Sequence, residues 1–371
     1  MFNSDFWWSV SLTEIKEHIN MKYYWILFFI SGLLSRCCID NNKAITFEPV
    51  KIIFDTDLGS DYDDVGALAF LHAMADSGKA EILGTLASNR YELTAPSIDV
   101  INTYFGRQDL PVGSPKTGGV TDISPYHWAD TIVALYPHTI KTTSDVPDAI
   151  SVYRKILVTQ PDTSVVVVTV GYLTNLSSLL KSLPDDISPL TGKDLIIKKV
   201  KRLVTMGGHF PDSGRSFNIF MDSSASEYLF RNWPGEIIFT GDDIGEKIRT
   251  GLRLINSGIK NSPVKDTYRI GMPLSGDLSG RMSWDQTAVL IGVYGTEGFF
   301  NRVHGKITVS PDGSNTWEDD PEGKHSYVKQ KMPVDEITKF IEDRMMHQPP
   351  AHAIRQCHPA LHDGSPVAYG R

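Results

Sequence analysis

The stretch VKIIFDTDLGSDYDD, residues 50–64, indicates the fold more clearly than any other part of the chain. Its first five residues, Val50 to Phe54, are short and mostly apolar, which predicts a buried strand. Five aspartates follow between Asp55 and Asp64, and a helical pattern then runs over 65–75. A buried strand that leads through a loop into a helix is the opening unit of an α/β fold.

The same alternation continues along the chain. Further strands are predicted over 81–87, 164–170, 200–206 and 236–239, with helices over 96–105, 177–183 and 223–232. The segment from Ser164 to Val170 is almost pure Val and Thr, which is typical of a central strand in a parallel sheet covered on both faces. The expected fold class is therefore α/β: a mostly parallel, open, Rossmann-like sheet flanked by helices, with right-handed crossovers.

Four of these strands run into segments that contain Gly or Asp. The segments that follow them are Asp55–Asp57, Gly171–Tyr172, Gly207–Gly208 and Gly241–Asp243. Binding sites of open parallel sheets lie outside the carboxyl ends of the strands, so these loops are expected to converge on one site.

Composition excludes one large class of partner. The chain has 371 residues, of which 41% are hydrophobic and 22% charged, and its net charge is −8. It contains no long run of Lys or Arg, so a nucleic-acid polymer is not an expected partner. The three cysteines match neither a disulfide framework nor a zinc-ligand spacing.

The amino-terminal segment has the layout of a signal peptide. Met21 and Lys22 precede an apolar run over 23–34, which is short for a membrane span and ends near Cys37 and Cys38. If translation starts at Met21, the protein is expected to be exported, either to the periplasm or as a membrane-anchored lipoprotein. Arg36 fits lipidation poorly, because a small residue is expected there. The predicted organisation is a targeting segment over 1–40, one α/β domain over 41–348 and a disordered tail over 349–371.

The acidic loop predicts a cation site. Several carboxylates cannot stay ionised at close range unless protons or a cation neutralise them, and oxygen ligands suit Ca²⁺ or Mg²⁺. The alternative is a solvated loop whose aspartates cap the following helix. An EF-hand is excluded, because Gly59 comes too early and no glutamate closes the loop.

The loop resembles the Asp-x-Asp-x-Gly-x-Asp-Asp motif that opens the inosine-uridine-preferring nucleoside hydrolases. The resemblance extends from about Lys51 to beyond Gly295 and implies the nucleoside hydrolase fold. The loop here is two residues longer, so either Asp61 or Asp63 could match the first aspartate of the pair; we align the pair with Asp63 and Asp64. The family pattern then implies that Asp57 and Asp64 bind Ca²⁺ and that Asp63 binds the substrate.

Further matches follow in the order of the family. Asn89 stands after the second strand, where the family has a substrate-binding asparagine. Val170-Gly171-Tyr172-Leu173-Thr174-Asn175 resembles the turn whose first carbonyl, here that of Val170, reaches calcium. Asn218 resembles the ribose-binding asparagine, and Asp285, in Ser283-Trp284-Asp285, resembles the last calcium carboxylate.

Two positions depart from the family pattern. Ser216 replaces a glutamate that contacts the 5′-hydroxyl, and the adjacent Arg215 makes an anionic 5′ group conceivable. Trp284 replaces a histidine that protonates the leaving base; a tryptophan can stack on a base but cannot donate that proton. The sequence leaves the acid open: the candidates are His127, His209 and His325, followed by Tyr172 and Tyr327, and Trp128, Trp284 and Trp317 could line a base pocket.

The resemblance implies calcium-dependent hydrolysis of the N-glycosidic bond of a ribonucleoside or related riboside. Asp57 would be the base that activates water, and Asp63, Asn89 and Asn218 would bind ribose hydroxyls. A homodimer or homotetramer is expected, as is usual for the family. One alternative is an exported calcium-dependent riboside-binding protein without turnover. A phosphatase with an aspartate nucleophile ranks last, because it leaves Asn218 and Asp285 unexplained.

Overall fold

The computed structural model describes residues 48–349. The predicted targeting segment over 1–40 and the tail from Pro350 onward lie outside the described residues, so those boundaries stay predictions. Within 48–349, no helix has the length and apolar character needed to cross a membrane.

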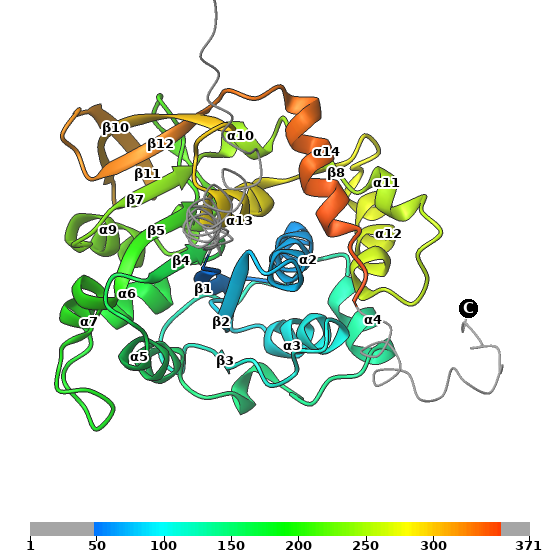
Figure 1. Cartoon of the computed structure of the whole chain (residues 1–371), viewed down its shortest axis with the longest axis horizontal. Helices are drawn as coiled ribbons and strands as arrows, with labels where there is room; N and C mark the ends of the chain where they lie inside the picture. Colours follow the sequence, from blue (N-terminus) through cyan, green and yellow to red (C-terminus); the bar gives the residue numbers. More distant parts are fainter. Residues whose placement is uncertain (1–47, 350–371) are drawn as a thin grey trace, which may run out of the picture. The chain divides into compact units, whose positions relative to one another are not determined.

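A ten-stranded sheet runs through the described part of the chain (Figure 1). Its order is β3-β2-β1-β4-β5-β7-β12-β10-β11-β6. The strands from β3 to β12 are parallel, and the pairs beyond β12 are antiparallel. The strands are β1 (Val50–Thr56), β2 (Ala80–Ala87), β3 (Val112–Gly113), β4 (Val165–Thr169), β5 (Val200–Met206), β6 (Gly214–Arg215), β7 (Ile237–Thr240), β10 (Phe300–Val309), β11 (Ser314–Asp319) and β12 (His325–Gln330). A separate pair joins β8 (Arg249–Thr250) to β9 (Arg281–Met282).

Helices cover both faces of the sheet. They are α2 (Asp63–Asp76), α3 (Thr94–Tyr104), α4 (Trp128–Leu135), α5 (Ala149–Thr159), α6 (Thr174–Lys181), α7 (Gly192–Lys199), α8 (Phe217–Met221), α9 (Ser223–Asn232), α10 (Asp242–Gly245), α11 (Leu252–Ile255), α12 (Pro263–Ser275), α13 (Trp284–Tyr294) and α14 (Val334–Met345), with a 3₁₀ turn at Thr143–Asp145. The predicted α/β class and mostly parallel sheet are confirmed. The strands and helices predicted between 50 and 240 are all present, with bounds shifted by up to about three residues.

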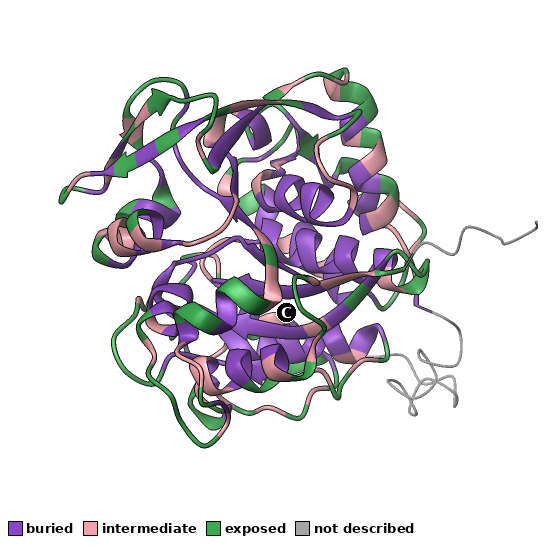
Figure 2. Ribbon diagram, turned by 60° about the vertical axis from the view of Figure 1, so that its left-hand side comes forward, coloured by how far each residue is buried: buried purple, intermediate pink, exposed green. Residues whose placement is uncertain are grey.

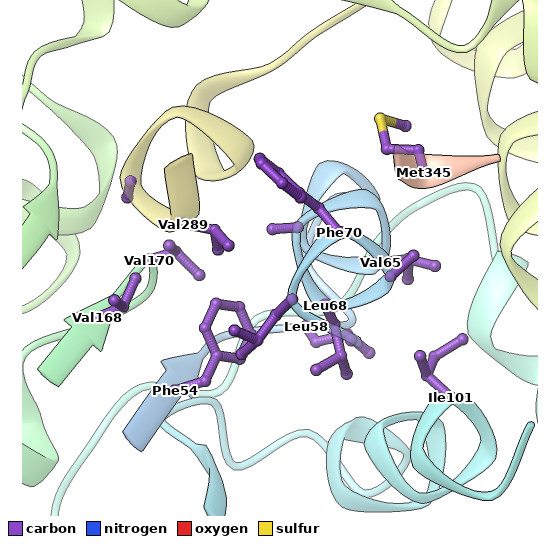
Figure 3. Close-up of a cluster of buried hydrophobic side chains, with 14 of the residues drawn as sticks. Phe54, Leu58, Val65, Leu68, Phe70, Ile101, Val168, Val170, Val289 and Met345 are labelled. Atoms are coloured by element: carbon purple, nitrogen blue, oxygen red, sulfur yellow. The ribbon is translucent and has the colours of Figure 1, made fainter. Parts of the chain in front are cut away.

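Alternation along the strands divides the core in two. Ile52 and Phe54 of β1 face one layer of helices, whereas Ile53 faces the other, because successive side chains of a strand point to opposite faces. Figure 3 shows Phe54 and Val168 on the side of α2 and α13. The burial colours of Figure 2 show the same arrangement, with buried strands inside and exposed residues on the outer helices.

Helix α2 is buried along most of its length. Every residue from Asp63 to Met74 is buried, because the helix packs against the sheet and against α3, α13 and α14. Its apolar residues therefore lie all round the helix and not on one stripe. The first turn of this helix carries two of the predicted site aspartates, so the core fixes their position.

Candidate active site

The carboxyl ends of the parallel strands meet at a cavity of about 540 Å³. Seven of the eight residues predicted from the sequence line it: Asp57, Asp63, Asp64, Val170, Asn218, Trp284 and Asp285. They come from the loops after β1 and β4 and from the first turns of α2, α8 and α13. The expected convergence of strand-end loops is thus present in the structure.

Four aspartates on this wall are almost fully buried. Asp63 and Asp64 are 1% exposed, Asp57 3% and Asp285 4%. Burial, followed by the charge of Asp61, raises the pKa of Asp57 to about 7. Burial and the neighbouring carboxylates raise the pKa values of Asp64 and Asp285 well above the ordinary range. The wall therefore favours either protons or a cation.

Gly171 allows two strand-end loops to touch. A Cβ at this position would lie 2.4 Å from the backbone nitrogen of Asp57 and 2.5 Å from the Ser88 hydroxyl. Those separations are far below van der Waals contact, so a side chain would push the β4 loop away from the acidic loop. The glycine brings the Val170 carbonyl and the Asp57 carboxylate to the same cavity wall.

Asn89 is the one predicted residue that does not line the cavity. Its Oδ1 accepts hydrogen bonds from the backbone N–H groups of Tyr91 (3.0 Å) and Asp122 (3.1 Å). Its Nδ2 donates to the carbonyls of Asp122 (2.7 Å) and Asp57 (3.3 Å). The amide is fully buried and occupied by main chain, so the structure places Asn89 behind the acidic loop, where it holds Asp57 in position.

Arg281 is a component of the site that sequence reasoning missed. It lies in β9 and is 7% exposed. Its Nη2 lies 2.8 Å from Asp63 and 2.5 Å from Asp61, and its Nη1 lies 3.6 Å from Asp277. The guanidinium also lies near the rings of Tyr62 (4.8 Å) and Trp284 (5.0 Å). Arg281 thus supplies a resident positive charge to the acidic wall.

The pairing with Arg281 does not decide whether Asp61 or Asp63 matches the first aspartate of the pair in the family motif. Both carboxylates contact the guanidinium and both line the cavity. Asp63 is buried and also accepts the backbone N–H of Asp285 at 3.3 Å, whereas the side chain of Asp61 is 45% exposed. Asp63 is therefore the more fixed of the two.

Asn218 contacts the Val170 carbonyl, the one main-chain group predicted to bind the cation. Its Nδ2 donates to the Val170 carbonyl at 2.7 Å, and the residue is 6% exposed on the cavity wall. This hydrogen bond orients the Asn218 side chain and uses one of the two lone pairs of the carbonyl oxygen.

Asp242, after β7, links several groups of the cavity lining. Its Oδ1 accepts the Ser216 hydroxyl at 2.8 Å, and its carbonyl accepts the Trp284 indole N–H at 2.9 Å. Its Oδ2 lies 3.8 Å from Nε2 of His209. Burial, partly offset by the Ser216 hydrogen bond, raises the pKa of Asp242 to about 6. Ser216, which departs from the family pattern, therefore contacts a carboxylate supplied by another strand end.

Among the histidine and tyrosine candidates, His209 alone lines the cavity. His127 is exposed and lies 3.3 Å from Asp130. His325 lies within the sheet, where burial, followed by the charge of Lys306, lowers its pKa to about 4. The Tyr172 hydroxyl donates to Asp122 at 3.4 Å, and burial raises its pKa far above the ordinary value.

The remaining aromatic candidates are packing residues. Tyr327 stacks on Phe210 with ring centroids 4.8 Å apart, and Trp317 meets Phe210 edge-on at 5.2 Å. Trp128 is fully buried in the core. Of the three predicted tryptophans, the structure brings only Trp284 to the cavity.

The buried carboxylates suit a hard cation by their chemistry. Within residues 48–349, no three His, Cys, Asp or Glu side chains are already drawn together as metal ligands. Nevertheless, Asp57, Asp64, Asp285 and the Val170 carbonyl are oxygen donors on one wall. Among the described residues, none donates a hydrogen bond to the Asp285 carboxylate. A buried carboxylate without a donor calls for a proton or a cation, so these residues fit a calcium-type ion.

The first aspartate of the acidic motif points elsewhere. Asp55 is fully buried, and its carboxylate accepts the Tyr153 hydroxyl at 2.7 Å and the Asn175 amide at 3.1 Å. Burial raises the pKa of Asp55 to about 7. Its contacts tie β1 to α5 and α6, so its position is structural.

Comparison with known proteins agrees with this geometry. The family model described as inosine-uridine preferring nucleoside hydrolase matches residues 52–369. Among curated protein sequences, none matches closely enough to count as a relative.

Solved structures share the fold at low identity. A plant nucleoside hydrolase is 18% identical, with a TM-score of 0.61 over 80% of this chain and 99% of its own. The inosine-uridine preferring nucleoside hydrolase from Bacillus anthracis is 16% identical, with a TM-score of 0.61 over 80% and 99%. The purine-preferring ribonucleoside hydrolase from Gardnerella vaginalis is 16% identical, with a TM-score of 0.61 over 80% and 98%.

Proposed function

Because the chain belongs to the inosine-uridine preferring nucleoside hydrolase family, we propose that it hydrolyses the N-glycosidic bond of a ribonucleoside or related riboside in a calcium-dependent reaction. The observation that carries the proposal is the convergence of Asp57, Asp64, Val170, Asn218 and Asp285 on one cavity. These residues come from four separate segments of the sequence, and a solvated acidic loop would not require the other three segments to meet it.

Asp57 is the proposed base. Its carboxylate lines the cavity and accepts hydrogen bonds from the side chains of Ser60, at 3.1 Å, and Tyr172. A carboxylate has about four lone-pair sites, so it can still accept a proton from water as that water attacks the anomeric carbon. The buried main chain around Asp57 is fixed by Asn89 and Gly171, so the base has a set position.

Asp57, Asp64, Asp285 and the Val170 carbonyl would hold the calcium ion. When bound, the ion supplies positive charge that orients ribose hydroxyls and water. Asp63 and Asn218 line the same wall and would accept or donate hydrogen bonds to those hydroxyls. Asn89 would support this surface from behind. A ribose-specific enzyme follows from this arrangement, because a deoxyribose would leave polar groups of the wall unpaired.

The alternatives differ in what they need from the acidic motif. A phosphatase would use one aspartate of the Asp-x-Asp pair as nucleophile, but Asp55 is fully buried and bonded to Tyr153 and Asn175. A riboside-binding protein would need the ribose contacts but not a carboxylate free to take a proton. The position of the Asp57 carboxylate on the cavity wall favours the enzyme.

The test is hydrolysis of a panel of purine and pyrimidine ribonucleosides, with their 2′-deoxy forms, before and after removal of calcium by a chelator. Release of base from ribonucleosides should stop with the chelator and return with Ca²⁺. Asp57→Asn should lower kcat at least about 100-fold, as is usual for loss of a general base. Asp130→Asn, an exposed carboxylate outside the cavity, is the matched control. Calcium and riboside binding without hydrolysis would favour the binding protein.

Export and self-association are also part of the proposal. The apolar run over 23–34 after Met21 supports export, and family membership supports a dimer or tetramer. Cell fractionation and light scattering would test them.

A further inference from the structure

Cleavage of an N-glycosidic bond leaves an electron pair on the base nitrogen. A poor leaving group of this kind departs faster when a positioned acid protonates it. Trp284 cannot supply that proton, and its indole N–H already donates to the Asp242 carbonyl. The proposed function therefore lacks an acid on the base side of the cavity.

We propose that His209, positioned by the Asp242 carboxylate, is the general acid that protonates the departing base. The proposal rests on the proposed function. As the C1′–N bond breaks, its electron pair moves to the base nitrogen, which takes a proton from the His209 imidazolium. Water adds its oxygen to C1′ and passes a proton to Asp57, and both side chains are reset by exchange with solvent.

The backbone of His209 is held on both sides. Its N–H donates to Oδ1 of Asn315 at 2.9 Å, and its carbonyl accepts the Asn315 amide at 2.9 Å. Asn315 is fully buried in β11. Phe210, the next residue, is anchored between Trp317 and Tyr327. A surface histidine without a function would not need a buried amide dedicated to its main chain.

The ring of His209 occupies space that a glycine leaves open. A Cβ at Gly214 would lie 2.4 Å from Cγ of the imidazole. The side chain is 48% exposed on the cavity wall, so it can exchange protons with solvent. Gly214 thus allows the ring to pack against backbone while it stays accessible.

Asp242 is the positioning residue. Its Oδ1 is occupied by the Ser216 hydroxyl, and its Oδ2 lies 3.8 Å from Nε2 of His209. An imidazolium carries N–H groups on both ring nitrogens, so with Nε2 toward Asp242 the Nδ1–H is left to donate. Because the carbonyl of the same Asp242 accepts the Trp284 indole, one residue places the acid and the aromatic ring on adjoining parts of the wall.

The other charged groups on this part of the wall are mostly acidic. Asp242, Asp243 and Glu246 lie on this part of the wall, with Arg215 as the opposing cation. Lys247 lies 3.6 Å from Asp243 and offsets that charge in part. The Arg215 guanidinium stacks on the Phe220 ring at 3.8 Å.

The test compares two leaving groups in the full-length protein. A purine or pyrimidine ribonucleoside needs protonation, whereas 4-nitrophenyl riboside releases a stable anion without it. His209→Gln should lower kcat/KM about 100-fold on the nucleoside and less than about threefold on the nitrophenyl substrate. Asp242→Asn should show the same selectivity with a smaller loss. His127→Gln, an exposed histidine outside the cavity, is the control.

The pH profile separates acid catalysis from a packing role. Wild-type kcat/KM on the nucleoside should have a limb that falls as pH rises, because a general acid must carry its proton, and His209→Gln should lose this limb. An equal loss on both substrates, or no loss on the nucleoside, would overturn the proposal while leaving the proposed function standing. A wild-type protein that cleaves neither substrate would overturn both.

Discussion

Replacing Arg281 by Met should expose the cost of an uncompensated carboxylate in the acidic wall. Met keeps much of the side-chain volume but removes the charge that contacts Asp63 and Asp61. Removing one partner of a buried ion pair costs about 3–5 kcal/mol, because the other charge stays buried. Loss of the contacts with the Tyr62 and Trp284 rings adds about 0.5–1 kcal/mol each.

The cost should depend on pH in a defined direction. Burial raises the pKa of Asp63 well above its ordinary value even in the presence of Arg281. A raised carboxyl pKa contributes stability at low pH that is lost as pH rises through the folded-state value. We therefore expect the variant to lose more stability at pH 8 than at pH 5, where a neutral Asp63 needs no counter-ion.

Urea unfolding in the presence of a chelator measures this difference. Arg269→Met is the matched control: Arg269 is 53% exposed and lies 3.2 Å from Asp266, so its loss should cost at most about 1 kcal/mol. Arg281→Met combined with Asp63→Asn should recover part of the lost stability. An Arg281→Met protein as stable as the Arg269→Met protein at pH 8 would refute the reasoning.

Three further outcomes follow from the structure. Gly171→Ala should lower nucleoside turnover at least tenfold and destabilise the fold by about 1–3 kcal/mol, since its Cβ would sit 2.4 Å from the backbone nitrogen of Asp57; kinetics and urea unfolding of the variant check both. His72 is fully buried, and burial, followed by the charge of Arg107, lowers its pKa to about 3. Between about pH 6.5 and 3, His72 therefore takes up a proton in the unfolded state but not in the folded state. Over this range the free energy of unfolding should fall by roughly 4 kcal/mol more in the wild type than in His72→Gln. Calcium at 100 times its Kd should raise the free energy of unfolding by about 2.7 kcal/mol, and the same addition to Asp64→Asn should leave thermal unfolding unchanged.

Local sequence carried most of the information about the parallel half of the fold. The Val-rich run before Gly171 and the apolar segment before Asp55 predicted β4 and β1 because buried parallel strands need continuous apolar residues. The antiparallel strands β10, β11 and β12 were not predicted. Buried and exposed residues alternate in the second half of β10, whereas β11 has a single buried residue and β12 begins with four buried residues, so the three strands share no single pattern.

The motif predicted which residues gather at the cavity but not how they are held. Arg281 gave no signal, because Asp61 and Asp63 are more than 200 positions away and meet it only in the folded chain. The occupied amide of Asn89 and the contact between Ser216 and Asp242 are likewise tertiary. A sequence specifies chemical groups, whereas hydrogen-bond satisfaction depends on distances that only the fold sets.

The buried Asn315 connects the antiparallel edge of the sheet to the cavity wall. It reaches from the β10–β11 hairpin to the main chain of His209, while the acidic loop rests on Asn89, Gly171 and the core around α2. The proposed sugar-side wall and the proposed base-side wall of the cavity therefore rest on separate parts of the scaffold. Under the proposed function, changes in the hairpin would alter the base-side wall and leave the carboxylate cluster untouched, so preference for the leaving group and the capacity for hydrolysis would diverge independently.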